Sequence, residues 1–146
     1  MIRCAPPDRS RSVPVRALDH LAITVADVDR TLRFYERVLG AESLYEELFR
    51  EGRIPVAMLQ VGGSRLSVHP AAKPAAPHAR VPTAGSADVC FRFDGPIADA
   101  KAMLEGAGVD VVLGPVPRPA ADGAMGQSVY FTDPDGNLLE LLSTDG

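Results

Sequence analysis

The feature that most constrains the fold of this chain is that the same order of predicted elements occurs in both halves of the sequence. In each half, a strand-like apolar segment precedes an amphipathic helical segment, a glycine and a run of further strands. Gly108 follows Gly40 by 68 positions, and Asp88 follows His20 by the same interval. One interval shared by several elements, with no gap between them, indicates a duplicated structural unit.

The first half begins with residues 18–25, which are rich in apolar and β-branched side chains and predict a strand. Asp27 is a suitable N-cap for the helix that follows. The apolar stripe of that helix ends at Gly40, which occupies the C′ position. Gly62 and Gly63 signal a hairpin. Strands are predicted around residues 42–49, 54–61 and 64–69.

The second half repeats this order, with a predicted strand over residues 88–93. Pro96 suits the first turn of a helix, which ends near Gly108. The segment Asp133-Pro134-Asp135-Gly136 predicts a tight turn. Further strands are predicted around residues 109–113, 126–132 and 137–142.

These boundaries give one domain over residues 17–146, preceded by a frayed tail over residues 1–16. The two modules span about 17–70 and 86–143. Repeated prolines between them favour an extended linker over residues 70–85.

Composition narrows the functional classes. The formal charge of −4 gives no basic footprint for nucleic acid, and no apolar run reaches the length of a membrane span. The first residues lack the apolar core of a secretory signal. Cys90 lies in an apolar run and is expected to be a small buried side chain, with no disulfide to Cys4. We therefore expect a protein of the reducing cytoplasm.

Four residues are candidates for metal binding. His20 and Asp88 occupy corresponding places in the two halves, and Glu140 lies among leucines, where an unpaired buried carboxylate would be costly. His69 shares a strand face with Ser67. Each residue alone is readily explained as an ordinary strand side chain, whereas imidazoles and carboxylates together suit a divalent metal. His78, in the linker, is expected to be solvated.

Other chemistries lack their motifs. The chain has no Gly-rich phosphate loop, no Gly-x-Ser-x-Gly elbow and no cysteine pairs with zinc-finger spacing.

Three segments resemble the glyoxalase/bleomycin-resistance/extradiol-dioxygenase superfamily: residues 18–25, 34–40 and 130–140, the last with its Asp-Pro-Asp-Gly turn. The resemblance extends over about residues 17–143. More narrowly, residues 65–69 and 85–91 look like small glyoxalase-like proteins sometimes labelled virulence proteins. The resemblance implies an α+β fold of two pseudo-repeated βαβββ modules that form a cupped mixed sheet around a metal site.

Within that resemblance, His20, Asp88 and Glu140 fall on metal-ligand positions of the superfamily, and His69 falls on or next to the fourth. Aligning Gly63 with Gly136 places Ser67, rather than His69, opposite Glu140. The implied cofactor is a divalent ion, with zinc, nickel, manganese or iron as candidates. Asp88 is a departure, since glyoxalase I, extradiol dioxygenases and fosfomycin-resistance transferases usually have histidine there.

The implied activity is that of a metal-dependent lyase or isomerase acting on a small oxygen-chelating substrate. The metal would act as a Lewis acid that stabilises an enediolate or another oxyanion, and Glu140 or a metal-bound water would move the proton. Alternatives within the superfamily are a thiol transferase, an extradiol dioxygenase and a non-catalytic protein that binds an antibiotic. The resemblance also implies a homodimer, since small superfamily members often build their sites from two chains.

Overall fold

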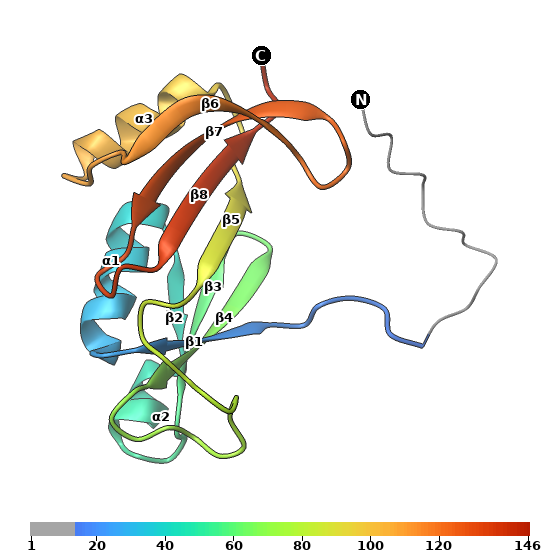
Figure 1. Ribbon diagram of the computed structural model, residues 1–146. Helices are drawn as coiled ribbons and strands as arrows, with labels where there is room; N and C mark the ends of the chain where they lie inside the picture. Colours follow the sequence, from blue (N-terminus) through green and yellow to red (C-terminus); the bar gives the residue numbers. More distant parts are fainter. Residues whose placement is uncertain (1–13) are drawn as a thin grey trace.

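Each half of the sequence folds into its own four-stranded mixed sheet (Figure 1). The structure is a computed structural model and describes residues 14–146. The predicted α+β architecture of two βαβββ modules is confirmed. Most of the predicted tail over residues 1–16, including Cys4, lies outside the described residues.

The first module has strand order β1-β4-β3-β2. Strands β1 and β4 are parallel, whereas the β3–β4 and β2–β3 pairs are antiparallel. Its elements are β1 (Leu21–Val25), α1 (Val28–Leu39), β2 (Glu42–Leu44), α2 (Glu46–Arg50), β3 (Ala57–Val61) and β4 (Ser64–Pro70).

Helix α1 begins and ends where the sequence predicts. The Asp27 carboxylate accepts a hydrogen bond from the N–H of Arg30 at 3.0 Å, which satisfies one of the free donors of the first turn. Gly40 closes the helix at a φ of 64°, a left-handed conformation that glycine adopts without a Cβ penalty. Leu32 and Tyr35 lie on the buried stripe of the helix.

The second module has the equivalent strand order, β5-β8-β7-β6, with β5 and β8 parallel. Gly108 has a φ of 73°, so the two glycines that are 68 positions apart share the same backbone conformation. The elements of this module are β5 (Asp88–Arg92), α3 (Ile97–Gly106), β6 (Leu113–Pro119), β7 (Met125–Thr132) and β8 (Leu138–Ser143).

The predicted strand over residues 42–49 is wrong after Leu44. Tyr45 takes a left-handed conformation with a φ of 60°, which ends β2, and α2 follows. The carboxylate of Glu46 and the guanidinium of Arg50 are 2.6 Å apart, an i,i+4 pair that supports a short helix. The left-handed turn at Tyr45 thus ends the strand, and the ion pair adds a small stabilisation to the helical turn over residues 46–50.

The predicted strand over residues 109–113 is also wrong, since β6 begins only at Leu113 and runs to Pro119. Three alternate residues of β6 are prolines, which lack the N–H that a central strand needs. Strand β6 is tolerated because it lies at the edge of its sheet and pairs only with β7.

One face of each sheet packs into a common core. Helix α1 covers the first sheet and α3 covers the second, and both lie on the same side of the molecule in Figure 1. The modules are joined by hydrogen bonds as well. The hydroxyl of Tyr35 donates to the Asp133 carboxylate at 3.1 Å, and the N–H of Ala26 donates to the Asp135 carboxylate at 3.0 Å.

Within the described residues, no helix is both long and apolar enough to cross a membrane.

Candidate functional site

The side of the first sheet that faces away from α1 carries a set of polar side chains. Because strand side chains alternate, the buried residues Ile23 and Val68 point to the core, and their neighbours point to the opposite side. We call this surface the histidine face; it comprises Ala22, Thr24, Ser67 and His69 of the paired strands, together with His20, which directly precedes β1 and lies near His69.

His20 precedes β1, and its ring is held by a neighbour that was expected to point away. Asp19 would alternate to the other side if the strand extended to it, but β1 begins only at Leu21. The Asp19 carboxylate lies 2.7 Å from Nδ1 of His20 instead. This hydrogen bond, reinforced by the imidazole charge, lowers the pKa of Asp19. The contact leaves Nε2 as the other nitrogen of His20 for a ligand.

His69 is half-buried on β4, and its Nε2 atom lies 2.9 Å from the hydroxyl of Ser67. Burial lowers the pKa of His69, and the nearby imidazoles of His20 and His78 lower it further. His20 and His78 therefore both lie close enough to His69 to affect its protonation.

A cavity of about 370 Å³ separates the histidine face from the linker. Thr24 and His69 line it from the sheet, while His78 and several prolines line it from the linker. His78, expected to be solvated, is exposed but also contributes to this wall. The linker therefore does more than join the two modules, because it forms one wall of the cavity beside His69.

The second sheet carries a corresponding surface, which we call the carboxylate face; its residues are Asp88, Cys90, Ser128 and Glu140. Glu140 is half-buried on β8, while its neighbours Leu139 and Leu141 point to the core. The buried hydroxyl of Ser128 donates a hydrogen bond to the Glu140 carboxylate at 2.5 Å. Ser128 therefore fixes the orientation of the candidate catalytic residue.

Cys90 is exposed, contrary to the expectation of a buried side chain. Its neighbours Val89 and Phe91 take the core positions of β5, so alternation turns the thiol to the carboxylate face. Local desolvation and the adjacent Glu140 carboxylate raise the pKa of Cys90 to about 12. Neither composition nor the apolar run around it identifies Cys90 as part of this face; only the alternation of the strand could do so.

The two faces match in register. Ser67 pairs with Ala22 across the parallel strands of the first module, and Glu140 pairs with Cys90 across those of the second. Ala22 and Cys90 are themselves 68 positions apart. Ser67 therefore holds the place that corresponds to Glu140, and His69 lies two residues further along.

The structure does not gather the four predicted ligands at one point of the chain. His20 and His69 belong to the first sheet, whereas Asp88 and Glu140 belong to the second. Over residues 14–146, no group of three or more histidine, cysteine, aspartate or glutamate side chains is arranged to hold a metal ion. Within the described chain, the two candidate histidines and the two candidate carboxylates therefore lie on separate sheets.

Known proteins are similar to this chain in both sequence and fold. The glyoxalase domain-containing protein RDO1 of Mycosarcoma maydis is 42% identical over 135 residues, covering 92% of this chain and 72% of that protein. The virulence protein STM3117 of Salmonella typhimurium is 40% identical, covering 85% and 81%. An integron cassette protein from the mobile metagenome of V. Cholerae superposes with a TM-score of 0.79 at 37% identity, covering 90% and 97%.

The match to a family extends over nearly the whole described domain. Residues 17–141 correspond to the Glyoxalase/Bleomycin resistance protein/Dioxygenase superfamily. Its duplicated architecture is the one that the two sheets and their shared 68-residue interval display. The chain belongs to the Glyoxalase/Bleomycin resistance protein/Dioxygenase superfamily.

Proposed function

We propose that this protein is a metal-dependent lyase or isomerase of the glyoxalase kind, acting on a small oxygen-chelating substrate. The observation that carries the proposal is the pair of matching faces, one with imidazoles and one with carboxylates, at equivalent places of a duplicated fold. Such a donor set suits a divalent first-row metal. Membership of the superfamily supports the same assignment.

On the histidine face, His20 and His69 would supply neutral imidazole ligands. Each has a polar partner on one ring nitrogen, Asp19 for His20 and Ser67 for His69. Partners of this kind orient ligating histidines and fix which nitrogen faces the ion. His69 engages Ser67 through Nε2, so Nδ1 is the nitrogen left for a ligand in this rotamer.

On the carboxylate face, Asp88 and Glu140 would complete the set. The metal, when bound, would polarise a substrate oxygen and stabilise the negative charge that develops on it. Glu140 is the residue that we assign to proton transfer, because Ser128 holds its carboxylate in a fixed direction. The thiol of Cys90 lies beside it and stays protonated near neutral pH, since its pKa is raised to about 12.

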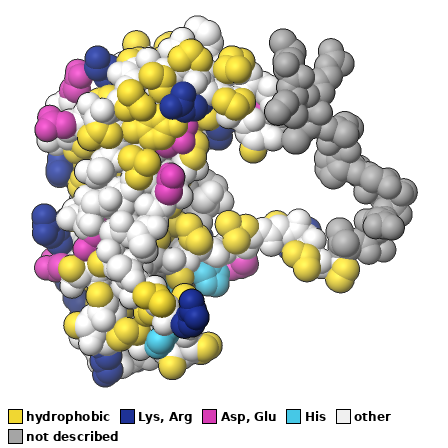
Figure 2. All heavy atoms as spheres, viewed as in Figure 1, with side chains coloured by type: hydrophobic (Ala, Val, Ile, Leu, Met, Phe, Trp, Pro, Cys, Tyr) yellow, Lys and Arg dark blue, Asp and Glu magenta, His cyan; other side chains and the backbone are white. Residues whose placement is uncertain are grey.

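The separation of the two faces within one chain leads us to infer a shared site. A second copy would place its carboxylate face against the histidine face of the first, and two-fold symmetry would generate two such sites. Exposed apolar side chains support an interface: Leu113 and Met125, on the edge hairpin β6–β7, are 48% and 67% exposed. Figure 2 shows hydrophobic side chains gathered over this part of the second sheet.

Complementation between two variants tests both the ligands and their sharing. His20→Ala and Glu140→Gln each remove one proposed ligand, so each homodimer should lose tight metal binding. In a mixed dimer of the two coexpressed variants, one site would combine the unchanged histidine face of the Glu140→Gln chain with the unchanged carboxylate face of the His20→Ala chain. The mixed dimer should therefore recover part of the wild-type metal content. If the mixed dimer recovers neither metal content nor turnover, the shared site is contradicted. Full metal retention in either variant alone would contradict that residue as a ligand.

Turnover needs a separate measurement. The wild-type protein, loaded in turn with zinc, nickel, manganese or iron, would be assayed on thiol adducts of methylglyoxal. Formation of a 2-hydroxyacyl thioester with at least one metal supports the lyase assignment. Metal binding without turnover on any such adduct would remove that activity and leave the superfamily membership unchanged.

A further inference from the structure

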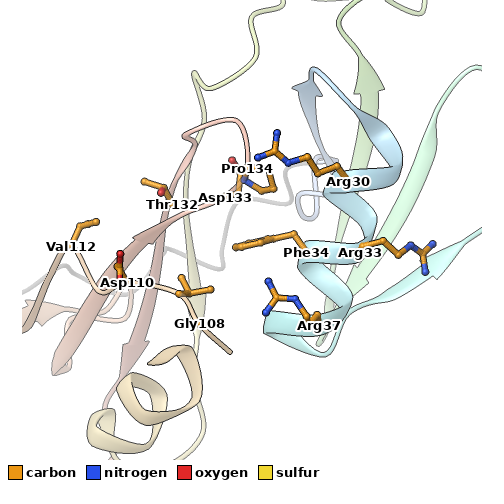
Figure 3. A pocket seen from close by; sticks show the side chains of 11 residues that line it. Arg30, Arg33, Phe34, Arg37, Gly108, Asp110, Val112, Thr132, Asp133 and Pro134 are labelled. Atoms are coloured by element: carbon orange, nitrogen blue, oxygen red, sulfur yellow. The ribbon is translucent and has the colours of Figure 1, made fainter. Parts of the chain in front are cut away.

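A second cavity, larger than the one beside the linker, lies on the other side of the first sheet from the histidine face. It has a volume of about 540 Å³ and opens between helix α1, the loop that follows α3 and the turn before β8 (Figure 3). Helix α1 covers the core side of β1, whereas His20 and His69 face away from it. This cavity therefore cannot share a ligand with the proposed metal site.

Two arginines of α1 give the cavity an unusual charge. Arg30 and Arg37 line it, and neither forms an ion pair with a carboxylate within residues 14–146. Arg37 donates one hydrogen bond, to the carbonyl oxygen of Ala107, which holds its guanidinium at the cavity while leaving most of its N–H donors free. Within the described chain, these two arginines on one face of α1 therefore have no carboxylate at ion-pair distance.

Two acidic residues, Asp133 and Asp110, also line the cavity, but neither forms an ion pair with Arg30 or Arg37 among the described residues. Both oxygens of the buried Asp133 carboxylate are already occupied by donors from Tyr35, Asp135 and Asn137. Asp110 lies on the opposite wall, across the cavity from α1 in Figure 3. The cavity therefore holds two unpaired guanidinium groups along α1, the fully hydrogen-bonded carboxylate of Asp133 in the turn before β8, and the carboxylate of Asp110 on the far wall.

A third arginine of the same helix behaves differently. Arg33 also borders the cavity, but it pairs with the carboxylates of Glu36 and Glu46, and Figure 3 shows its side chain turned away from Arg30 and Arg37. Arg33 therefore offers a matched control, being the same residue type on the same helix with its charge already paired.

Phe34 lies between the two free arginines and extends into the cavity (Figure 3). Arg30 and Arg37 are seven residues apart, which corresponds to about 10 Å along a helix axis. Val109 and Val112 add apolar surface from the second module. An aromatic surface bracketed by two cations suits a flat apolar body that carries negative charge at both ends.

We propose that this cavity binds a flat aromatic dianion, with the ring against Phe34 and one anionic group on each of Arg30 and Arg37. The cavity volume lies in the range usual for small-molecule sites. The far wall, with Asp110, orients the anionic groups towards α1. This site is separate from the proposed metal site and does not depend on the metal chemistry.

Isothermal titration calorimetry on the full chain tests the site with 2,6-naphthalenedicarboxylate. Its neutral counterpart, 2,6-naphthalenedimethanol, has the same ring system without the charges. We expect the dicarboxylate to bind and the diol not to bind at the same concentrations. Arg30→Gln and Arg37→Gln should each weaken binding by about tenfold, the scale of one lost charge-assisted hydrogen bond, whereas Arg33→Gln should change it less than twofold.

Added salt should weaken the dicarboxylate complex, because its attraction to partly exposed guanidinium groups is screened. His20→Ala and Glu140→Gln should leave it unchanged, so this site can fail or hold independently of the proposed enzyme. Equal binding of the diol, or equal losses for Arg33→Gln and Arg30→Gln, would overturn the proposal. So would the absence of any dicarboxylate binding at millimolar concentration by a protein whose unfolding transition is intact.

Discussion

The hydroxyl oxygen of Ser67 lies 2.9 Å from Nε2 of His69, two residues further along the same face of β4. Ser67 occupies the register position that corresponds to Glu140 in the second module, yet a serine hydroxyl is a weaker metal ligand than an imidazole. In the first module, the position equivalent to Glu140 is therefore held by the small side chain of Ser67, which is hydrogen-bonded to the larger imidazole of His69.

Substitution of Ser67 and His69 should distinguish the residue that binds the metal from the residue that orients it. We expect His69→Ala to abolish tight metal binding, and Ser67→Ala to weaken it by about tenfold, the usual scale for loss of an outer partner. Titration of the metal-free proteins with Zn²⁺ measures both affinities. The reverse order of effects would show that Ser67, and not His69, faces the metal.

His69 should also make stability depend on pH. Burial, with the charges of His20 and His78, lowers the pKa of His69 below its usual 6.5, so the unfolded chain binds the proton more readily than the folded chain. The contribution of His69 to the free energy of unfolding is therefore fully present above pH 6.5 and is lost as the pH decreases from there through the folded pKa.

Urea unfolding in the presence of a chelator, at about pH 8 and about pH 5.5, measures this dependence on either side of the ordinary histidine pKa. We expect His69→Gln to lose less stability than the wild type between the two pH values, because it lacks the group that titrates. An equal loss in both proteins would mean that other groups account for the acid sensitivity.

The sequence predicted the modules well because their signals are local. Asp27 and Gly40 mark the ends of α1 through hydrogen bonding and backbone conformation that need no tertiary partner. The failures have tertiary causes. Tyr45 adopts a left-handed conformation that a tyrosine rarely takes in isolation, and the prolines of β6 are acceptable only because that strand lies at a sheet edge.

The candidate site was predictable in part for the same reason. Alternation within a strand places Ser67 with His69, and Asp88 with Cys90, on one face from local geometry alone. The register between neighbouring strands, which brings Cys90 beside Glu140, is a tertiary property. The distance between the histidines and the carboxylates depends on how the two sheets are placed relative to each other and on any second chain. No short sequence segment encodes that placement. The expectation of a buried Cys90 was wrong because apolar neighbours in sequence do not imply burial in a strand that turns every second residue outward.

The Cys90 thiol reports on the charge of Glu140. Local desolvation and the neighbouring carboxylate raise the pKa of Cys90 to about 12, so little thiolate should be present at about pH 9. Replacing Glu140 by glutamine removes the negative charge, which should lower the thiol pKa and speed its alkylation by roughly tenfold, the effect of about one pKa unit.

The measurement is the iodoacetamide reaction rate against pH, followed by mass spectrometry in a Cys4→Ser background, which leaves Cys90 as the single thiol. Glu105→Gln, on the exposed surface of α3, is a control for a general change in net charge. Equal acceleration by both substitutions would exclude a local effect of Glu140.

Gly85, at one end of the linker, and Gly136, in the adjoining turn, have nearly the same left-handed conformation, with φ of 79° and 83°. An added Cβ at Gly85 would lie 2.5 Å from the carbonyl oxygen of Asp135, whereas one at Gly136 would meet no atom within 4 Å. Alanine at either position has a conformational cost of about 1–2 kcal/mol, and only Gly85→Ala adds a clash with backbone that cannot rotate away. We therefore expect Gly85→Ala to have the lower urea midpoint, with the difference between the two variants measuring the contact that seats the linker against the Asp133–Gly136 turn. Equal midpoints would show that the linker moves aside at little cost, so that the cavity beside His69 is not held in a fixed shape by this contact.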